Sequence, residues 1–101
     1  MSTAQPASID GEDLEALVRR AAGAESDAQD ELVRRFQDMA VGYAWSVLGD
    51  RHLAEDASQD AFVAALKQLP SLREPAAFPA WFRRVLYKHC DRMTRGRSVA
   101  S

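Results

Sequence analysis

The sequence predicts an all-α fold, a compact bundle of about four helices. No segment alternates apolar and polar residues over any length, and no Asn-Gly or Asp-Gly turn joins two such segments. Apolar residues recur instead at helical spacing in four stretches, which glycines and prolines separate. A chain of 101 residues is long enough to bury a modest core without a metal or a disulfide.

The first helix is expected after a flexible tail of residues 1–8, which is rich in Ser, Thr, Gln, Pro and Ala. Asp10 can cap this helix, with Ile9 and Leu14 as a hydrophobic staple across its first turn. Gly23 is expected to end it. One apolar stripe lies between these signals, formed by Leu14, Leu17, Val18 and Ala21.

The second helix is predicted to be long. Ser26, followed three residues later by Gln29, matches a capping box, and helical periodicity then continues to Gly49. Two apolar strips on roughly opposite sides predict a helix packed between neighbours. The first contains Leu32, Phe36, Met39, Ala40, Tyr43 and Val47, and the second contains Val41, Trp45 and Leu48.

The third helix is expected to begin after Asp50, a good N-cap residue, and to end at Pro70. Its apolar side carries Phe62, Ala65, Leu66 and Leu69. The opposite side carries Asp56, Gln59, Asp60, Val63 and Lys67. Residues 70–77 are interrupted by two prolines and predict a structured loop without an element of its own.

The last helix is expected to start with Pro75 or Pro79 in its first turn and to run toward Gly96. Its charged residues are not scattered around the helix. The apolar face consists of Phe78, Phe82, Val85, Leu86, His89 and Met93. A separate stripe consists of Arg84, Lys88, Asp91 and Arg95, with Trp81 and Arg92 beside it.

The charge is unevenly distributed along the chain. Residues 1–69 carry 13 Asp and Glu against 6 Lys and Arg, a net −7, whereas residues 70–101 carry 2 against 7, a net +5. This asymmetry indicates a nucleic-acid or other polyanion contact at the basic end. The alternative is a solvated helix whose charges bind nothing. Cations at helical spacing beside an indole can meet successive phosphates and an unpaired base, which favours nucleic acid.

The composition excludes several other classes. With 47% hydrophobic and 28% charged residues, the chain resembles an ordinary globular protein. It lacks an apolar run long enough to span a bilayer and lacks a secretory signal at its start, so the cytoplasm is the expected compartment. Cys90 is the only cysteine and forms no metal-ligand spacing with His52 or His89, so it is expected to be a small buried side chain.

Signals for catalysis are missing from the sequence. It contains no Gly-rich phosphate loop, nucleophile elbow, His-x-Glu or Cys-x-x-Cys, so we expect neither an enzyme nor a cofactor. His89 falls on an apolar stripe and is expected to be a core histidine with a satisfied hydrogen bond. His52 is expected at the surface. Trp81 borders the apolar stripe, so core packing and base stacking both stay open.

The order and spacing of these residues resemble the conserved second region of bacterial RNA polymerase sigma factors. The pattern is Ala54-Glu55-Asp56, then Gln59 and Phe62, then Phe78 and Trp81, then a basic run from Arg92 to Arg97. The resemblance is to the sigma-70 family and most closely to its extracytoplasmic-function (ECF) group, and it covers about Glu31 to Arg97. It implies a region 2-like helical domain over residues 9–97, with a short tail at 98–101.

What the resemblance implies is a domain that binds core RNA polymerase and recognises promoter DNA. It would dock on the clamp helices of the β′ subunit and would recognise and help to melt the minus-ten element on the non-template strand. An anti-sigma factor is a further partner of this family. The carried-over polymerase-binding residues are Asp56, Gln59, Asp60 and Val63. The DNA-binding residues are Ser71, Arg73 and Glu74, in the loop that accepts an extruded base, and Trp81, Arg84, Lys88, Arg92 and Arg95.

The chain departs from the family pattern in several places. Ala57-Ser58 replaces bulky aliphatic residues, Lys88 stands where asparagine is common, and His89-Cys90 replaces apolar residues. The helix-turn-helix domain that follows in such factors is absent from this chain, which is either part of a longer protein or a single-domain relative. The alternative function is a helical protein–protein module that uses the 56–67 face and does not bind DNA.

Overall fold

The computed structural model describes residues 13–100, with side chains through residue 95, and it is helical as predicted. The helices are α1 (Leu14–Ala22), α2 (Ser26–Leu48), α3 (Arg51–Gln68) and α4 (Phe78–Ala100). Two 3₁₀ turns, η2 (Leu69–Ser71) and η3 (Pro75–Ala77), join α3 to α4. No strand occurs in residues 13–100, so the all-α bundle of about four helices is confirmed.

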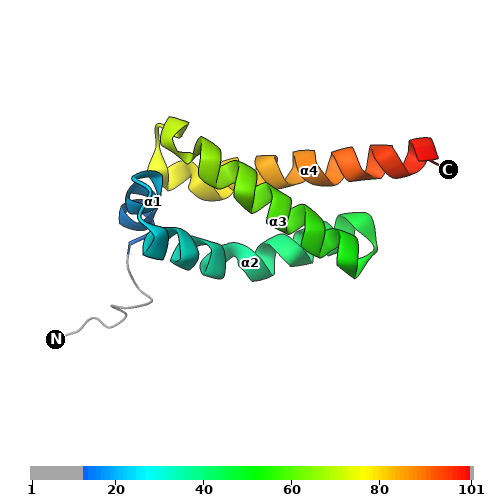
Figure 1. Cartoon of the computed structure of the whole chain (residues 1–101), viewed down its shortest axis with the longest axis horizontal. Coiled ribbons are helices and arrows are strands. Elements are labelled where there is room, and N and C mark those ends of the chain that lie inside the picture. Colours follow the sequence, from blue (N-terminus) through cyan, green and yellow to red (C-terminus); the bar gives the residue numbers. More distant parts are fainter. Residues whose placement is uncertain (1–12, 101) are drawn as a thin grey trace.

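The helices α2, α3 and α4 form the body of the molecule, and α1 packs at one end (Figure 1). Four phenylalanine rings fill the centre. Phe82 stacks on Phe62 and Phe78 at centroid distances of 4.6 and 5.6 Å, and Phe36 meets Phe78 edge-on at 5.0 Å. The buried side of α3 is otherwise mostly alanine, which lets its neighbours approach closely; its alanines are Ala54, Ala57, Ala61 and Ala65.

The turn between α1 and α2 differs from the prediction in one detail. Helix α1 ends before Gly23 as expected, but the left-handed residue is Ala24, with φ of 69°. The Ala24 N–H donates to the Ala21 carbonyl at 3.0 Å and the Glu25 N–H to the Arg20 carbonyl at 3.2 Å, a Schellman motif. These two bonds hold an alanine in a conformation that costs L-residues about 1–2 kcal/mol.

The capping box predicted for α2 does not form, and the cap predicted for α1 lies outside the described residues. Helix α1 begins after Asp13, and the expected cap Asp10 and staple residue Ile9 lie outside the described residues. The capping box at the start of α2 is wrong, because Ser26 is already helical. Gln29 instead donates its side-chain Nε2 to the Ala21 carbonyl at 3.1 Å. This bond ties α1 to α2, a contact that a local pattern cannot reveal.

The second apolar strip of α2 is only partly covered by neighbours. Leu48 is buried and Val41 packs against the core, as a helix between neighbours requires. Trp45 is 46% exposed, however, and the guanidinium of Arg51 lies over its ring at 5.2 Å. Val47, from the first strip, is exposed as well. The prediction of a helix covered on both sides is therefore wrong at this end of α2.

The start of α3 and the end of α2 are fixed by local signals. Gly49 adopts φ of 70° and donates its N–H to the Trp45 carbonyl at 2.8 Å, which ends α2. Asp50 then caps α3, because its Oδ1 accepts the Leu53 N–H at 2.9 Å. The predicted cap is confirmed, and it fixes the residue at which α3 begins.

The connection from α3 to α4 is more regular than a loop. Pro70 ends the α-helix as predicted, but the chain continues in two 3₁₀ turns, so the prediction of no element in 70–77 is wrong. Helix α4 has Pro79 in its first turn, as expected, while Pro75 begins η3. It also continues past Gly96 to Ala100, since one glycine costs a helix only about 1 kcal/mol. None of the helices in residues 13–100 is both long and apolar enough to span a bilayer.

Candidate functional site

The outward side of α3 is exposed as the sequence predicts. Asp56, Gln59 and Asp60 lie at the surface, and Val63 is 56% exposed, which is high for a large apolar side chain. Lys67 is exposed on the same helix. Because α3 is buried along its alanine side and capped at Asp50, these side chains are held in a fixed row. The row offers carboxylates, an amide and an apolar group to a partner.

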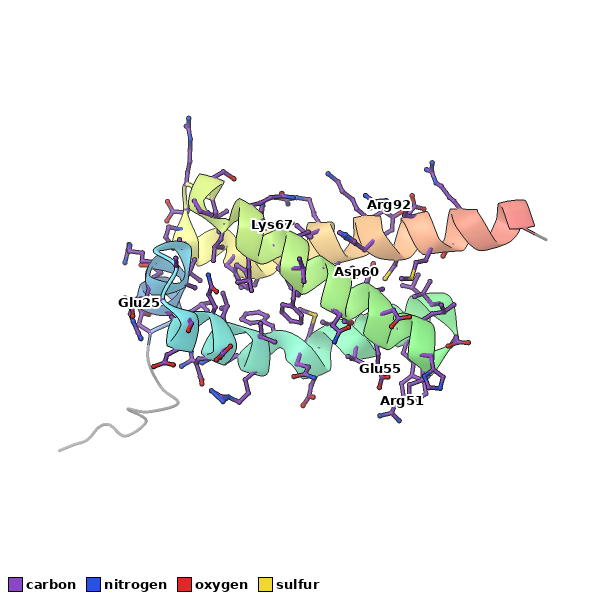
Figure 2. The ribbon with its side chains drawn as sticks, in the orientation of Figure 1. Glu25, Arg51, Glu55, Asp60, Lys67 and Arg92 are labelled. Atoms are coloured by element: carbon purple, nitrogen blue, oxygen red, sulfur yellow. The ribbon has the colours of Figure 1, made fainter. Side chains whose placement is uncertain are left out.

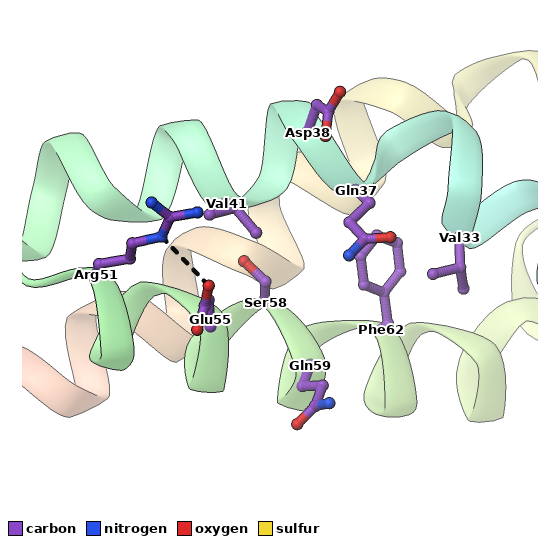
Figure 3. Close-up of a pocket in the computed structure, with 9 residues that line it drawn as sticks. All are labelled: Val33, Gln37, Asp38, Val41, Arg51, Glu55, Ser58, Gln59 and Phe62. Atoms are coloured by element: carbon purple, nitrogen blue, oxygen red, sulfur yellow. Dashed lines mark hydrogen bonds and ion pairs between the residues drawn. The ribbon is translucent and has the colours of Figure 1, made fainter.

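A groove separates α2 from α3 (Figure 3). Phe62 contributes an apolar wall, and an ion pair between Arg51 Nε and Glu55 Oε2, at 3.4 Å, lies at one end. Gln59 is the member of the predicted polymerase-binding set that lines this groove. We call it the α2/α3 groove; its volume is about 420 Å³, and its lining residues are Val33, Gln37, Asp38, Val41, Arg51, Glu55, Ser58, Gln59 and Phe62.

Ser58 is an unusual feature of the α2/α3 groove. Its side chain is only 3% exposed, yet its Oγ has no hydrogen-bond partner among the described residues. A buried hydroxyl without a partner destabilises a fold by about 1–3 kcal/mol. The hydroxyl points into the groove (Figure 3), where an incoming polar group could satisfy it. The sequence showed only that Ser58 replaces an aliphatic residue of the family pattern.

The basic stripe of α4 is a positive surface in this structure. Arg84, Lys88 and Arg92 are exposed and form no ion pair with any residue that the structure describes. Arg95 is exposed too, but its Nε lies 3.0 Å from Asp91 Oδ2. Exposed pairs of this kind contribute about 0–1 kcal/mol, so Arg95 can exchange its partner for a phosphate. Three of these four side chains therefore lack an ion-pair partner among the described residues, and the fourth, Arg95, has a weak one.

Core packing, one of the two roles that the sequence left open for Trp81, is what the structure shows. Trp81 is partly buried against the core and lies 5.9 Å from Phe78, centroid to centroid. Tyr87 is instead 53% exposed, and the exposed Arg83 and Arg84 precede it by one helical turn. Tyr87 and Arg83 were missed from the sequence, although a helical wheel places both away from the apolar face. Tyr87 is the aromatic side chain that α4 presents to solvent.

The loop residues of the predicted DNA-binding set lie around the two 3₁₀ turns. Ser71, Arg73 and Glu74 are exposed. The Ser71 hydroxyl donates to the Gln68 carbonyl at 2.7 Å, which ties η2 to the end of α3. The short turns limit the conformations of this segment, so its exposed side chains are presented by an ordered backbone.

A second groove lies between α3 and α4 and joins the two predicted surfaces. Asp60 and Val63, from the polymerase-binding set, line it together with Arg92, from the DNA-binding set. The two sets are therefore adjacent rather than separate. We call it the α3/α4 groove; its volume is about 470 Å³, and its lining residues are Asp60, Val63, Ala64, Lys67, Gln68, His89 and Arg92.

His89 contributes a titratable ring to the α3/α4 groove. Its Nδ1 lies 3.2 Å from the Val85 carbonyl oxygen, which can only accept, so the predicted hydrogen bond is confirmed. Burial, and next the positive charge of Arg92, lower the pKa of His89, while Asp60 opposes them. The imidazole is therefore neutral through most of the physiological range.

Cys90 and His52 lie where the sequence predicts. Cys90 is fully buried, and burial raises the pKa of its thiol. The Cys90 side chain is therefore an unreactive part of the hydrophobic core. His52 is exposed. Within the part of the chain that the structure describes, no three His, Cys, Asp or Glu side chains are grouped so as to hold a metal ion.

The structure thus places an exposed, acidic and amide-bearing face of α3 beside an exposed cationic stripe of α4. Residues 32–99, well over half of the chain, match the family model for sigma-70 region 2, and the chain belongs to this family. In sigma factors, this region binds core RNA polymerase and recognises the minus-ten element, without catalysis. Neither the curated proteins nor the solved structures contain a match.

Proposed function

We propose that this domain is region 2 of an ECF-group sigma factor. It binds the β′ clamp helices of core RNA polymerase through α3, and it recognises and helps to melt the minus-ten element through α4 and the η2–η3 loop. The observation that carries the proposal is the contrast between two exposed surfaces. The outward side of α3 carries Asp56, Gln59 and Asp60, and α4 carries cations that no described residue neutralises.

The α3 surface suits a helical partner. Its carboxylates can pair with cations of the β′ subunit, and Val63 supplies an apolar contact. Gln59 stands at the rim of the α2/α3 groove, where a partner side chain could enter and reach the unpaired Ser58 hydroxyl. An anti-sigma factor would compete for the same surface.

The α4 surface suits a single DNA strand. Arg84, Lys88 and Arg92 follow one another at four-residue spacing, so they lie along one side of the helix and can meet successive phosphates. Extruding a base from the duplex costs a few kcal/mol, which phosphate contacts and a shaped loop can offset. Ser71, Arg73 and Glu74 lie in that loop, Trp81 packs against the core at the start of α4, and Arg95 extends the cationic row.

The domain limits follow from this assignment. Residues 9–97 would form the region 2 domain, although α4 continues to Ala100. Its place of action would be the cytoplasm, where a bacterial polymerase transcribes.

The polymerase contact is tested by binding of the domain to an immobilised β′ clamp-helix fragment. We expect Asp56→Ala and Gln59→Ala each to weaken binding about tenfold, because each removes a polar contact at the interface. Asp30→Ala is the matched control, since Asp30 is an exposed acid on α2 outside both grooves. Equal affinities for all four proteins would contradict this half of the proposal.

The DNA contact is tested by fluorescence anisotropy with a single-stranded minus-ten oligonucleotide across a salt series. Each phosphate contact on single-stranded DNA contributes about 0.7 to the slope of log affinity against log salt. We therefore expect Arg84→Ala and Lys88→Ala each to flatten the slope by about that amount. Arg34→Ala, an exposed cation on α2, is the control. A protein–protein module without DNA binding would show no oligonucleotide binding even at low salt.

A further inference from the structure

The α3/α4 groove brings together nitrogen donors from two helices. Lys67 and Gln68 come from the end of α3, and His89 and Arg92 come from α4. Figure 2 labels Lys67 and Asp60 along α3 and Arg92 on α4. Neither Lys67 nor Arg92 forms an ion pair with a residue in the described part of the chain. Two unpaired cations and an amide around one concave site are the chemistry that binds an anion.

His89 adds a further hydrogen-bond donor to the groove, its Nε2–H, when the imidazole ring is protonated. Since the Nδ1 proton is used by the Val85 carbonyl, Nε2 is the ring atom left for another partner. A neutral imidazole offers only a lone pair at Nε2, whereas a protonated one donates from it. An anion in the groove would therefore favour the protonated ring.

Asp60 lies in the same groove and works against an anion. Its carboxylate faces His89 together with the positive charge of Arg92, and Lys67 completes the charged groups that line the groove. Asp60 is exposed, so a cation of a bound protein can reach it. A partner that neutralises Asp60 would remove the one negative charge in the groove.

We propose that the α3/α4 groove binds a phosphodiester group of the single-stranded promoter DNA through Lys67, Arg92 and His89. The carboxylate of Asp60 weakens this binding until a cation of the polymerase neutralises that carboxylate. The assignment of the bound phosphate to promoter DNA rests on the proposed function, whereas the presence of an anion site in this groove does not. Lys67 and His89 thus extend the DNA-binding surface onto α3. Because Asp60 also belongs to the proposed polymerase surface, each partner would strengthen the binding of the other.

The pH dependence of binding follows from the same geometry. His89 is mainly neutral near pH 7, since burial and Arg92 lower its pKa. Phosphate binding favours the charged ring and raises that pKa, so affinity should increase as the pH falls from about 7.5 to 5.5. Replacing His89 with Gln removes this increase while keeping a hydrogen-bonding side chain.

The test uses the full chain with two probes, inorganic phosphate and a single-stranded minus-ten oligonucleotide. Phosphate binding is followed by the imidazole NMR signals of His89, and oligonucleotide binding by anisotropy at low salt. We expect Lys67→Ala to weaken both by about three- to tenfold and Asp60→Asn to strengthen both by about threefold. The matched controls change the same charge elsewhere: Arg34→Ala for the lysine and Asp30→Asn for the aspartate.

The outcomes separate this inference from the proposed function. If Arg84→Ala and Lys88→Ala weaken oligonucleotide binding but Lys67→Ala and Asp60→Asn behave like their controls, the groove site is overturned and the proposed function stands. If phosphate shifts the His89 signals and Lys67→Ala abolishes the shift without affecting the oligonucleotide, the assignment to DNA is overturned. If no variant affects the oligonucleotide, the proposed function itself fails.

Discussion

The two grooves that border α3 differ in their chemistry. The α2/α3 groove holds a hydrogen-bonding amide, a buried hydroxyl without a partner and one internal ion pair. The α3/α4 groove holds an imidazole, a single carboxylate and two cations that form no ion pair within the described residues. The proposed polymerase surface reaches both grooves, because Gln59 lines the first groove whereas Asp60 and Val63 line the second. The position of a residue around α3, rather than its position in the sequence, decides which groove it lines.

The largest effect on the free energy of unfolding is expected when Phe62, in the core between α2, α3 and α4, is truncated. Phe62 lines the α2/α3 groove and stacks on Phe82 of α4 at 4.6 Å. We expect Phe62→Ala to lower the free energy of unfolding by about 3–5 kcal/mol, measured by urea denaturation and circular dichroism. Val63→Ala, at the next and exposed position, should lower it by less than about 0.5 kcal/mol. Equal losses in the two variants would contradict the packing described for α3.

A smaller loss of stability is expected when the N-cap of α3 is removed. Asp50 accepts the Leu53 N–H at 2.9 Å, so Asp50→Ala leaves an unpaired donor at the helix end. We expect the free energy of unfolding to fall by about 1 kcal/mol, with Asp50→Asn retaining most of the cap. Loss of the cap frays the Arg51 end of the α2/α3 groove and leaves the α3/α4 groove intact. Equal weakening of phosphate and clamp-fragment binding would show that the grooves are not independent.

Substitution of Ser58, in the α2/α3 groove, is expected to affect the stability of the domain and its binding to polymerase differently. Because its buried Oγ has no hydrogen-bond partner among the described residues, Ser58→Ala should leave the free energy of unfolding unchanged or raise it by up to about 1 kcal/mol. The same change should weaken binding to the β′ clamp-helix fragment, if that partner supplies the missing hydrogen bond. Thermal denaturation and the binding assay measure the two effects. A clear loss of stability would mean that the hydroxyl is already satisfied.

The smallest effect concerns the α3/α4 groove and pH. The pKa of His89 is lowered in the folded state, so the unfolded chain binds more protons as the pH falls through about 6.5. The free energy of unfolding should therefore decrease modestly as the pH is lowered through that range. His89→Gln should flatten the decrease. An identical pH profile for wild type and His89→Gln would contradict the burial of this ring.

Features that depend on neighbours along the chain could be predicted from the sequence. The cap at Asp50, the end of α3 at Pro70 and the hydrogen bond of His89 each depend on residues within one helical turn. The apolar face of α4 was also predictable, because burial of Phe78 and Phe82 follows the helical period.

Features that depend on packing between helices could not be predicted. Periodicity indicates that Trp45 is apolar and faces away from Leu32, but not that no neighbour covers it. Gln29 bonds to α1 rather than to its own helix, because the Ala21 carbonyl is nearby in space. The α3/α4 groove joins Lys67 to Arg92, which no local spacing relates. The exposed faces of α3 and α4 could thus be predicted from the sequence, whereas the grooves that border α3 required the fold.

The most direct test is whether the domain binds the β′ clamp-helix fragment and the single-stranded minus-ten oligonucleotide at the same time. Sedimentation of all three components measures this, with anisotropy reporting oligonucleotide affinity as the fragment is added. We expect a 1:1:1 complex in which the fragment raises oligonucleotide affinity, and this increase should be lost in Asp60→Asn. Mutual displacement of the fragment and the oligonucleotide would contradict the assignment of α3 to the polymerase and α4 to DNA.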